Sequence, residues 1–124
     1  MKNKIKIAFQ GENGAYSHLA CLEMFPNSEP LACPTFEAAF QLGSEDQEYK
    51  IVIPIENSLA GRVADIHYLI PKYGLQIHAE HFQKVTHNLL GVKGSKLEDI
   101  KTVRSHAQAI SQCRKIILNN NLNC

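Results

Sequence analysis

The run at 51–55, Ile-Val-Ile-Pro-Ile, is the feature that most narrows what this chain can fold into. Four of its five residues are isoleucine or valine, and no polar residue interrupts them. Such a run is typical of a strand buried on both faces, as occurs in parallel sheets that helices cover. Pro54 cannot donate a backbone hydrogen bond, so we expect the strand to end there.

Extended and helical patterns alternate along the rest of the chain. We expect further strands at 4–9, 75–82, 85–92 and 101–104, and one helical turn at 97–100. Helical spacing predicts four helices. The first runs from Tyr16 to before Pro26, the second follows a Thr35 cap, and the third begins after Gly61 and is closed by Pro71 with Gly74. The fourth spans 107–118, and its inward-facing residues are Ala109, Cys113, Ile116 and Ile117. This alternation predicts an α/β architecture with a largely parallel sheet.

Charge and hydropathy exclude several classes of protein. Thirteen Lys and Arg are scattered among twelve acids, which gives a net charge of +1 and argues against a nucleic-acid partner. The start of the chain has only a short apolar stretch, interrupted by Lys6. A signal peptide needs roughly 7–15 apolar residues and a membrane helix about 20, so we expect a cytoplasmic protein without membrane association.

Cysteine and histidine spacing predicts no disulfide framework and no metal site. His78 and His81 lie three residues apart without a third ligand nearby, and no CxxC pair occurs. We expect reduced, structural thiols at all four cysteines, Cys21, Cys33, Cys113 and Cys124.

Polar residues gather at three strand-to-helix junctions, 10–17, 56–61 and 105–112. In open α/β sheets, ligands bind beyond the carboxyl ends of the strands, near helix N-termini. The first junction carries Gly11, Gly14 and Ser17 but lacks the Gly-Lys-Ser/Thr of a phosphate loop. It fits either a tight turn with a capping serine or a loop that approaches a ligand closely.

The other two junctions carry neutral hydrogen-bonding side chains. The strand at 51–55 is followed by Glu56, Asn57 and Ser58. These three side chains could line the edge of a cleft. Alternatively, Asn57 or Ser58 caps a helix and Glu56 faces solvent. Ser105 fits a helix cap, and Gln112 lies on the surface of the helix that follows. Adjacent residues rarely face each other, which disfavours a nucleophile and base at Ser105–His106. A plain helix start and a cleft lined by neutral donors both remain open.

The end of the chain suggests a fragment. No strand follows the last predicted helix before Cys124, although an α/β unit normally returns to its sheet. We therefore expect a chain cut in the middle of a domain.

Four ordered segments resemble signatures of the prephenate dehydratase family. The resemblance extends from Ile5 to Ile117 and rests on 9–18 (FQGENGAYSH), 33–36 (CPTF), 54–58 (PIENS) with Gly61, and 105–114 (SHAQAISQCR). It implies a type II periplasmic-binding-protein-like fold, two lobes with a cleft. Residues 1–80 would form most of the first lobe and 81–124 an incomplete second lobe. The family's reaction converts prephenate to phenylpyruvate in phenylalanine biosynthesis, without metal or organic cofactor.

The resemblance also implies roles for individual residues. Asn57, Ser105 and Gln112 would line the active site, with Glu56 beside them. The loop with Gly11, Gly14 and Ser17, together with Ser58, would help to shape it. The family's Thr-Arg-Phe signature, which supplies the threonine assigned as the acid, does not occur in the chain, nor does a regulatory ACT domain. We therefore expect little activity from these 124 residues alone.

Two other functions remain open: arogenate dehydratase, which is the same reaction on an aminated substrate, and a noncatalytic two-lobed module that binds small anions and shares only the fold. Family members often form homodimers, so a homodimer is an expected assembly.

Overall fold

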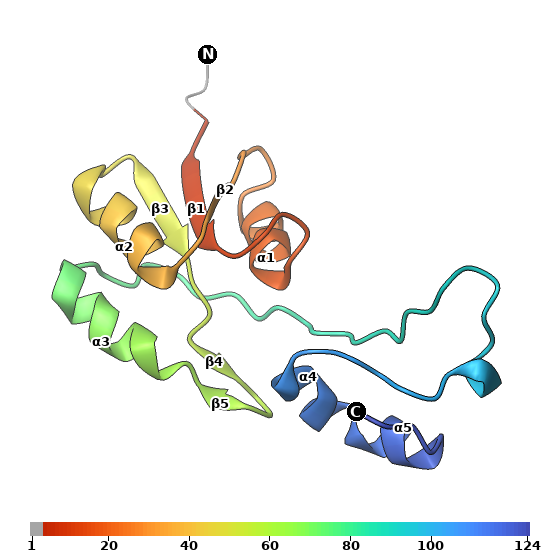
Figure 1. The fold of residues 1–124 in the computed structure, drawn as a ribbon. Helices are drawn as coiled ribbons and strands as arrows, with labels where there is room; N and C mark the ends of the chain where they lie inside the picture. Colours follow the sequence, from red (N-terminus) through yellow and green to blue (C-terminus); the bar gives the residue numbers. More distant parts are fainter. Residues whose placement is uncertain (1–3) are drawn as a thin grey trace. The chain divides into compact units, whose positions relative to one another are not determined.

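The computed structural model describes residues 4–124. The chain divides into two compact units, 1–84 and 85–124; Figure 1 labels their helices and strands. The first unit contains, in chain order, β1 (Lys6–Gln10), α1 (Tyr16–Met24), β2 (Leu31–Cys33), α2 (Phe36–Glu45), β3 (Tyr49–Val52), β4 (Glu56–Asn57), β5 (Gly61–Arg62) and α3 (Ala64–Tyr73). The second contains the 3₁₀ helix η1 (Leu97–Asp99), α4 (Ala107–Gln112) and α5 (Arg114–Asn119).

A three-stranded parallel sheet in the order β2-β1-β3 forms the centre of the first unit. In the register of the sheet, Ala8 of β1 lies opposite Leu31 on one side and Ile51 on the other. The predicted α/β class and parallel pairing are confirmed. β2 was not predicted, because it is only three residues long and too short to show a period.

The core lies on both faces of β1. Ile7 and Phe9 pack with Cys21 of α1, whereas Ala8 packs with Ala39 of α2. All five side chains are fully buried. β1 is therefore the strand that is buried on both faces, because β3 lies at the edge of the sheet and its residues from 49 to 52 are half-buried or exposed.

Helix α3 packs on α2 through a third apolar cluster that joins Phe40 with Ile66 and Leu69. Burial of each such side chain stabilises the fold by about 1.5–3 kcal/mol. Pro71 was expected to close α3, but it lies inside the helix, which ends at Tyr73. Pro71 lacks the N–H that would bond the carbonyl four residues earlier, and Gly74 with φ 66° terminates the helix as predicted.

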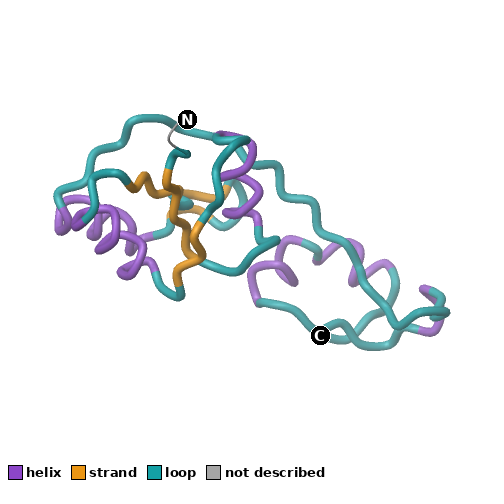
Figure 2. Tube along the Cα trace, turned by 90° about the horizontal axis from the view of Figure 1, so that it is seen from above, coloured by secondary structure: helices purple, strands orange, loops and turns teal. Residues whose placement is uncertain are grey.

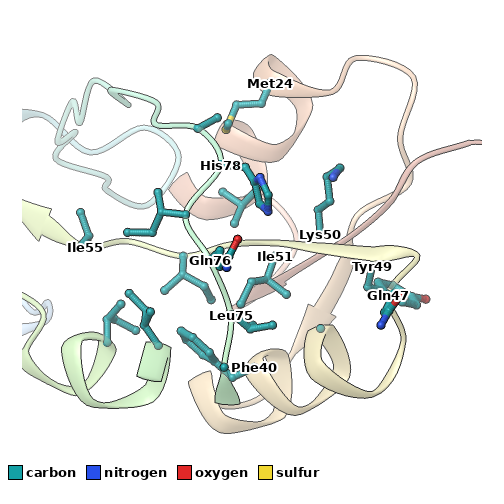
Figure 3. Close-up of a pocket in the computed structure, with 18 of the residues that line it drawn as sticks. Met24, Phe40, Gln47, Tyr49, Lys50, Ile51, Ile55, Leu75, Gln76 and His78 are labelled. Atoms are coloured by element: carbon teal, nitrogen blue, oxygen red, sulfur yellow. The ribbon is translucent and has the colours of Figure 1, made fainter. Parts of the chain in front are cut away.

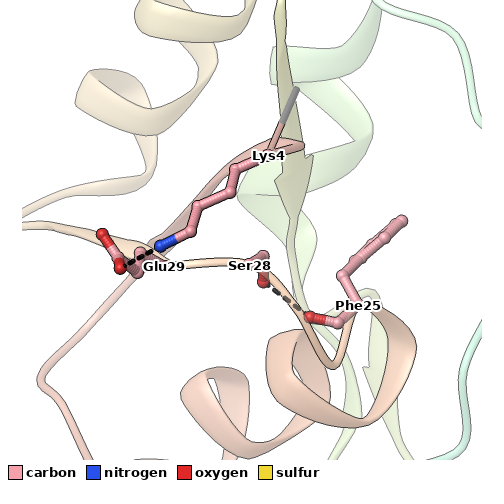
Figure 4. Close-up of polar contacts among 4 residues, drawn as sticks. All are labelled: Lys4, Phe25, Ser28 and Glu29. Carbon is pink, nitrogen blue, oxygen red and sulfur yellow. Dashed lines mark hydrogen bonds and ion pairs between the residues drawn. The ribbon is translucent and has the colours of Figure 1, made fainter. Parts of the chain in front are cut away.

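Local polar contacts hold the connections around the sheet. In Figure 4, Lys4 pairs with Glu29, and the Ser28 hydroxyl donates to the Phe25 carbonyl at 2.8 Å. These contacts lie at the turn between α1 and β2. The Thr35 hydroxyl accepts from the Ala38 N–H at 3.1 Å, which confirms the predicted cap of α2.

The predicted strands at 75–82 and 85–92 are wrong. Residues 75–96 contain no helix or strand, and Figure 2 shows the stretch after α3 as loop. Their alternating apolar residues are typical of a strand, but a strand needs a neighbour to satisfy its backbone groups, and none pairs with them within the described residues. Phe82 and Leu90 are each 86% exposed as a result.

The second unit has short elements and a small core. The predicted strand at 101–104 is reduced to one bridge between Thr102 and Asn123. The predicted helix at 107–118 breaks at Cys113 into α4 and α5. Ile117 is buried as expected, whereas Ile116 is 51% exposed, so its predicted inward position is wrong. η1 confirms the predicted turn at 97–100.

Candidate active site

The loop after β1 is shaped by two glycines and a histidine. Gly11 and Gly14 have φ values of 128° and 93°, which L side chains rarely adopt. The Gly14 N–H donates to His18 Nδ1 at 2.9 Å, and the His18 ring stacks on Phe9 with centroids 5.4 Å apart. Ser17 lies inside α1 and does not cap it, since the N-cap is Ala15 without a side-chain bond. The capping interpretation of Ser17 is therefore wrong.

Asn57 organises the hairpin of β4 and β5. Its Oδ1 accepts from the backbone N–H groups of Leu59 and Ala60 at 2.9 and 3.0 Å. The side chain is half-buried, whereas its neighbours Glu56 and Ser58 are exposed. Neither Asn57 nor Ser58 caps a helix, because the N-cap of α3 is Val63. Asn57 holds a turn at the end of the sheet instead.

In the second unit, Ser105 and Gln112 flank α4. The cap of α4 is His106, whose Nδ1 accepts from the Gln108 N–H at 3.4 Å, so the expected Ser105 cap is wrong. Ser105 is exposed and directly precedes that cap. Gln112 is the last residue of α4 and is half-buried. Its Oε1 lies 2.8 Å from His87 Nε2.

The sheet topology brings the first two junctions to the same edge. β1 and β3 are parallel neighbours, so the loop at 11–17 and the hairpin at 56–62 both follow carboxyl ends of strands. The Gly11 N–H also donates to the Cys33 carbonyl at 3.0 Å, which ties this loop to the end of β2. Ser105 and Gln112 belong to the other unit.

A cavity of about 580 Å³ lies elsewhere in the first unit (Figure 3). Apolar side chains of α2, β3, α3 and residues 75–79 dominate its lining, among them Phe40, Ile51 and Leu75, with Lys50 and His78 also contributing. None of the site residues expected from the sequence lines it. The chemistry predicted for the junctions therefore does not belong to this cavity.

In the part of the chain that the structure describes, neither the thiols nor a group of metal-ligating side chains forms a second candidate site. All four cysteines are free, and burial raises the pKa of Cys21 to about 11 and also raises the pKa of Cys33. Within residues 4–124, no cluster of three His, Cys, Asp or Glu side chains could hold a metal ion, and no helix is long and apolar enough to cross a membrane. His81 instead pairs with Glu23 of α1, at 3.0 Å.

Two histidines that contact residues of the predicted site were not expected from the sequence. His18 lies four residues beyond Gly14 on the first turn of α1, a spacing that could have suggested the contact. His87 is 25 residues from Gln112 and sits in a segment with no regular structure, so no local signal could have revealed it.

The fold is that of an α/β protein with a three-stranded parallel sheet, and the first two junctions follow the carboxyl ends of its strands. The chain belongs to the prephenate dehydratase family, whose model matches residues 7–123. The resemblance seen in its four signatures is thereby confirmed.

Relatives support the same family. The chain is 47% identical, over 90% of its length, to a bifunctional N-acyl-homoserine lactone acylase/prephenate dehydratase of Komagataeibacter europaeus. It is 48% identical, again over 90%, to arogenate dehydratase/prephenate dehydratase 1, chloroplastic, of Arabidopsis thaliana. The solved structure of GqqA, described as a novel type of quorum quenching acylase, is 45% identical over 95% of the chain, with a TM-score of 0.79. The chain spans 40%, 28% and 43% of these three proteins respectively.

Proposed function

We propose that this chain supplies part of the active site of a prephenate dehydratase with a two-lobed, type II periplasmic-binding-protein-like fold. The reaction consumes the prephenate dianion and one proton, and it yields the phenylpyruvate anion, carbon dioxide and water. The proton goes to the departing ring hydroxyl. The electron pair of the bond to the ring carboxylate moves into the ring, which becomes aromatic.

Neutral donors suit this reaction better than cations. A strong cation beside the departing carboxylate would stabilise the ground state and oppose its loss. Amides, hydroxyls and backbone N–H groups can hold the dianion without that penalty, and each preorganised donor typically contributes about 2.7–4 kcal/mol to transition-state stabilisation. The proposed catalytic residues are Asn57, Ser105 and Gln112, with Glu56 beside them. Gly11, Gly14, Ser17 and Ser58 would shape the pocket.

The observation that carries the proposal is the fixed amide of Asn57. Its oxygen accepts two backbone hydrogen bonds within the hairpin, so the orientation of the amide is set before any ligand arrives. The amide nitrogen can only donate. Asn57 therefore offers a donor of set direction at the edge of the sheet where ligands of α/β proteins bind.

A hybrid enzyme tests the function. Residues 7–123 of this chain would replace the corresponding segment of the Komagataeibacter relative, and phenylpyruvate formation would be measured. We expect an active hybrid in which N57A lowers kcat about 10²–10³-fold. N27A, at an exposed asparagine between α1 and β2, is the matched control and should leave kcat unchanged. A folded hybrid that makes no phenylpyruvate, or an N57A hybrid with full activity, would contradict the proposal.

Arogenate is the second candidate substrate, because the Arabidopsis relative is named for both activities. The same hybrid should be assayed with each substrate, and a higher kcat/KM for arogenate would shift the assignment. Binding without turnover of either would favour the noncatalytic anion-binding module. The 124 residues alone should form phenylpyruvate far more slowly than the hybrid, since no Thr-Arg-Phe sequence occurs in them.

The proposal includes a reducing compartment such as the cytoplasm, which the four free cysteines favour. A homodimer, the assembly expected from the family, also remains part of the proposal.

A further inference from the structure

We propose that His87 is a positioning residue that fixes the side-chain amide of Gln112, so that the amide nitrogen is directed toward a carboxylate of a small dianionic substrate. This inference rests on the proposed function, because it assigns Gln112 to the same site. It adds a residue that none of the sequence signatures includes.

The hydrogen bond between the two side chains determines the direction of the amide. His87 Nε2 lies 2.8 Å from Gln112 Oε1. An amide oxygen can only accept, so the proposed orientation of Gln112 requires a hydrogen on Nε2 of His87. The neutral ring protonated at Nε2 and the imidazolium both satisfy this requirement. In either form, a flipped amide would place its own N–H group against the ring N–H, which disfavours the flip.

Gln112 needs such a partner more than Asn57 does. A glutamine side chain has three rotatable bonds, and ordering it costs up to about 1.5–2 kcal/mol of conformational entropy. Gln112 is the last residue of α4, directly before the break at Cys113. The contact with His87 orders the side chain before ligand binding, which is the condition for a preorganised donor.

The two proposed amide donors therefore have the same arrangement. The oxygen of Asn57 accepts from the backbone of its own turn, and the oxygen of Gln112 accepts from His87. In both, a hydrogen bond to the oxygen sets the direction of the amide nitrogen. This pattern suits an anionic ligand, which can accept hydrogen bonds but cannot donate them.

NMR of the ¹⁵N-labelled 124-residue protein tests the positioning role directly. Long-range ¹H–¹⁵N spectra should show His87 protonated at Nε2, and H87A should displace the side-chain NH₂ signals of Gln112. H67A, at an exposed histidine of α3, is the matched control and should not displace them. A His87 ring protonated only at Nδ1, or Gln112 signals unchanged by H87A, would overturn the inference.

Titration with prephenate at constant pH tests the consequence. We expect H87A to weaken binding about tenfold, the effect of one lost orienting hydrogen bond. H87Q, which restores an N–H donor, should recover most of the affinity. In a Q112A background, H87A should change the affinity less than twofold, because His87 acts through Gln112. Equal losses in both backgrounds would overturn the positioning role.

The two proposals fail in different ways. A wild-type protein that does not bind prephenate counts against the proposed function, while the His87 tautomer and the Gln112 signals still decide whether the amide is positioned. Tight prephenate binding that H87A leaves unchanged refutes the positioning role and leaves the proposed function intact.

Discussion

The two units of the chain differ sharply in how their site residues are supported. Of the twelve buried apolar residues among those described, ten belong to the first unit, and only Ile117 and Leu122 belong to the second. The first unit has a sheet with helices packed on both faces, whereas the second has one isolated bridge and helices of six residues or fewer.

This difference shows two ways of fixing a polar side chain. Asn57 follows a strand of the cored sheet and is held by backbone donors of its own turn. Gln112 lies in a unit with little core, and its amide oxygen is held by another side chain, His87. We expect the first arrangement to be stable by itself and the second to depend more on single contacts.

The largest expected effect is on the core of the first unit. F9A removes a fully buried ring from β1 and should lower the free energy of unfolding by about 3–5 kcal/mol. I117A, in the second unit, should cost about 2 kcal/mol or less, since Leu122 is the one other buried apolar residue described in that unit. Urea unfolding combined with hydrogen exchange measures both. If F9A and I117A lowered the free energy of unfolding equally, or if amides in β1 and α5 were equally protected from exchange, the two units would not differ in stability.

A second comparison uses the cysteines. Burial raises the pKa of Cys21 from an ordinary 9.0 to about 11, whereas Cys124 is exposed. At pH 8 we expect Cys21 to react with iodoacetamide at least about 100-fold more slowly than Cys124, since the thiolate is the nucleophile. Mass spectrometry of alkylated peptides gives both rates, and similar rates would contradict the burial of Cys21.

The raised pKa of Cys21 also predicts how the free energy of unfolding depends on pH. The neutral thiol is favoured in the folded state, so the Cys21 contribution is fully present below pH 9. It is lost as the pH rises from about 9 to about 11, because the unfolded chain ionises first. C21A should flatten that part of the stability curve, which urea unfolding at several pH values can measure.

The smallest expected effects concern the helix caps. T35A removes a 3.1 Å bond at the start of α2 in the first unit and should cost about 1 kcal/mol. H106A removes a longer 3.4 Å bond at the start of α4 and should cost only a few tenths of a kcal/mol. Thermal unfolding distinguishes them, and a larger effect of H106A would reverse the expected order.

Most helices could be predicted from the sequence because their signals are local. Thr35 before Phe36 identifies the start of α2, and the spacing from Tyr16 to Met24 identifies α1. The break at Cys113 was not predictable, because apolar residues on both sides of it continue the helical spacing.

Strands were harder to predict because pairing is not local. Residues 75–82 alternate as a strand does, but no neighbour pairs with them, whereas the short β2 is a strand because β1 lies beside it. The candidate site shows the same limit. Asn57 could be proposed as a site residue because it comes after an apolar strand. The contact between His87 and Gln112 could not be predicted, because it joins residues far apart in the chain.

The most direct test of the account is an NMR titration of the ¹⁵N-labelled protein with prephenate, following the side-chain NH₂ signals of Asn57 and Gln112. Both amides should shift together along one binding curve, because both are proposed to donate to the same dianion. Signals that stay unmoved, or that shift at clearly different prephenate concentrations, would contradict a shared site.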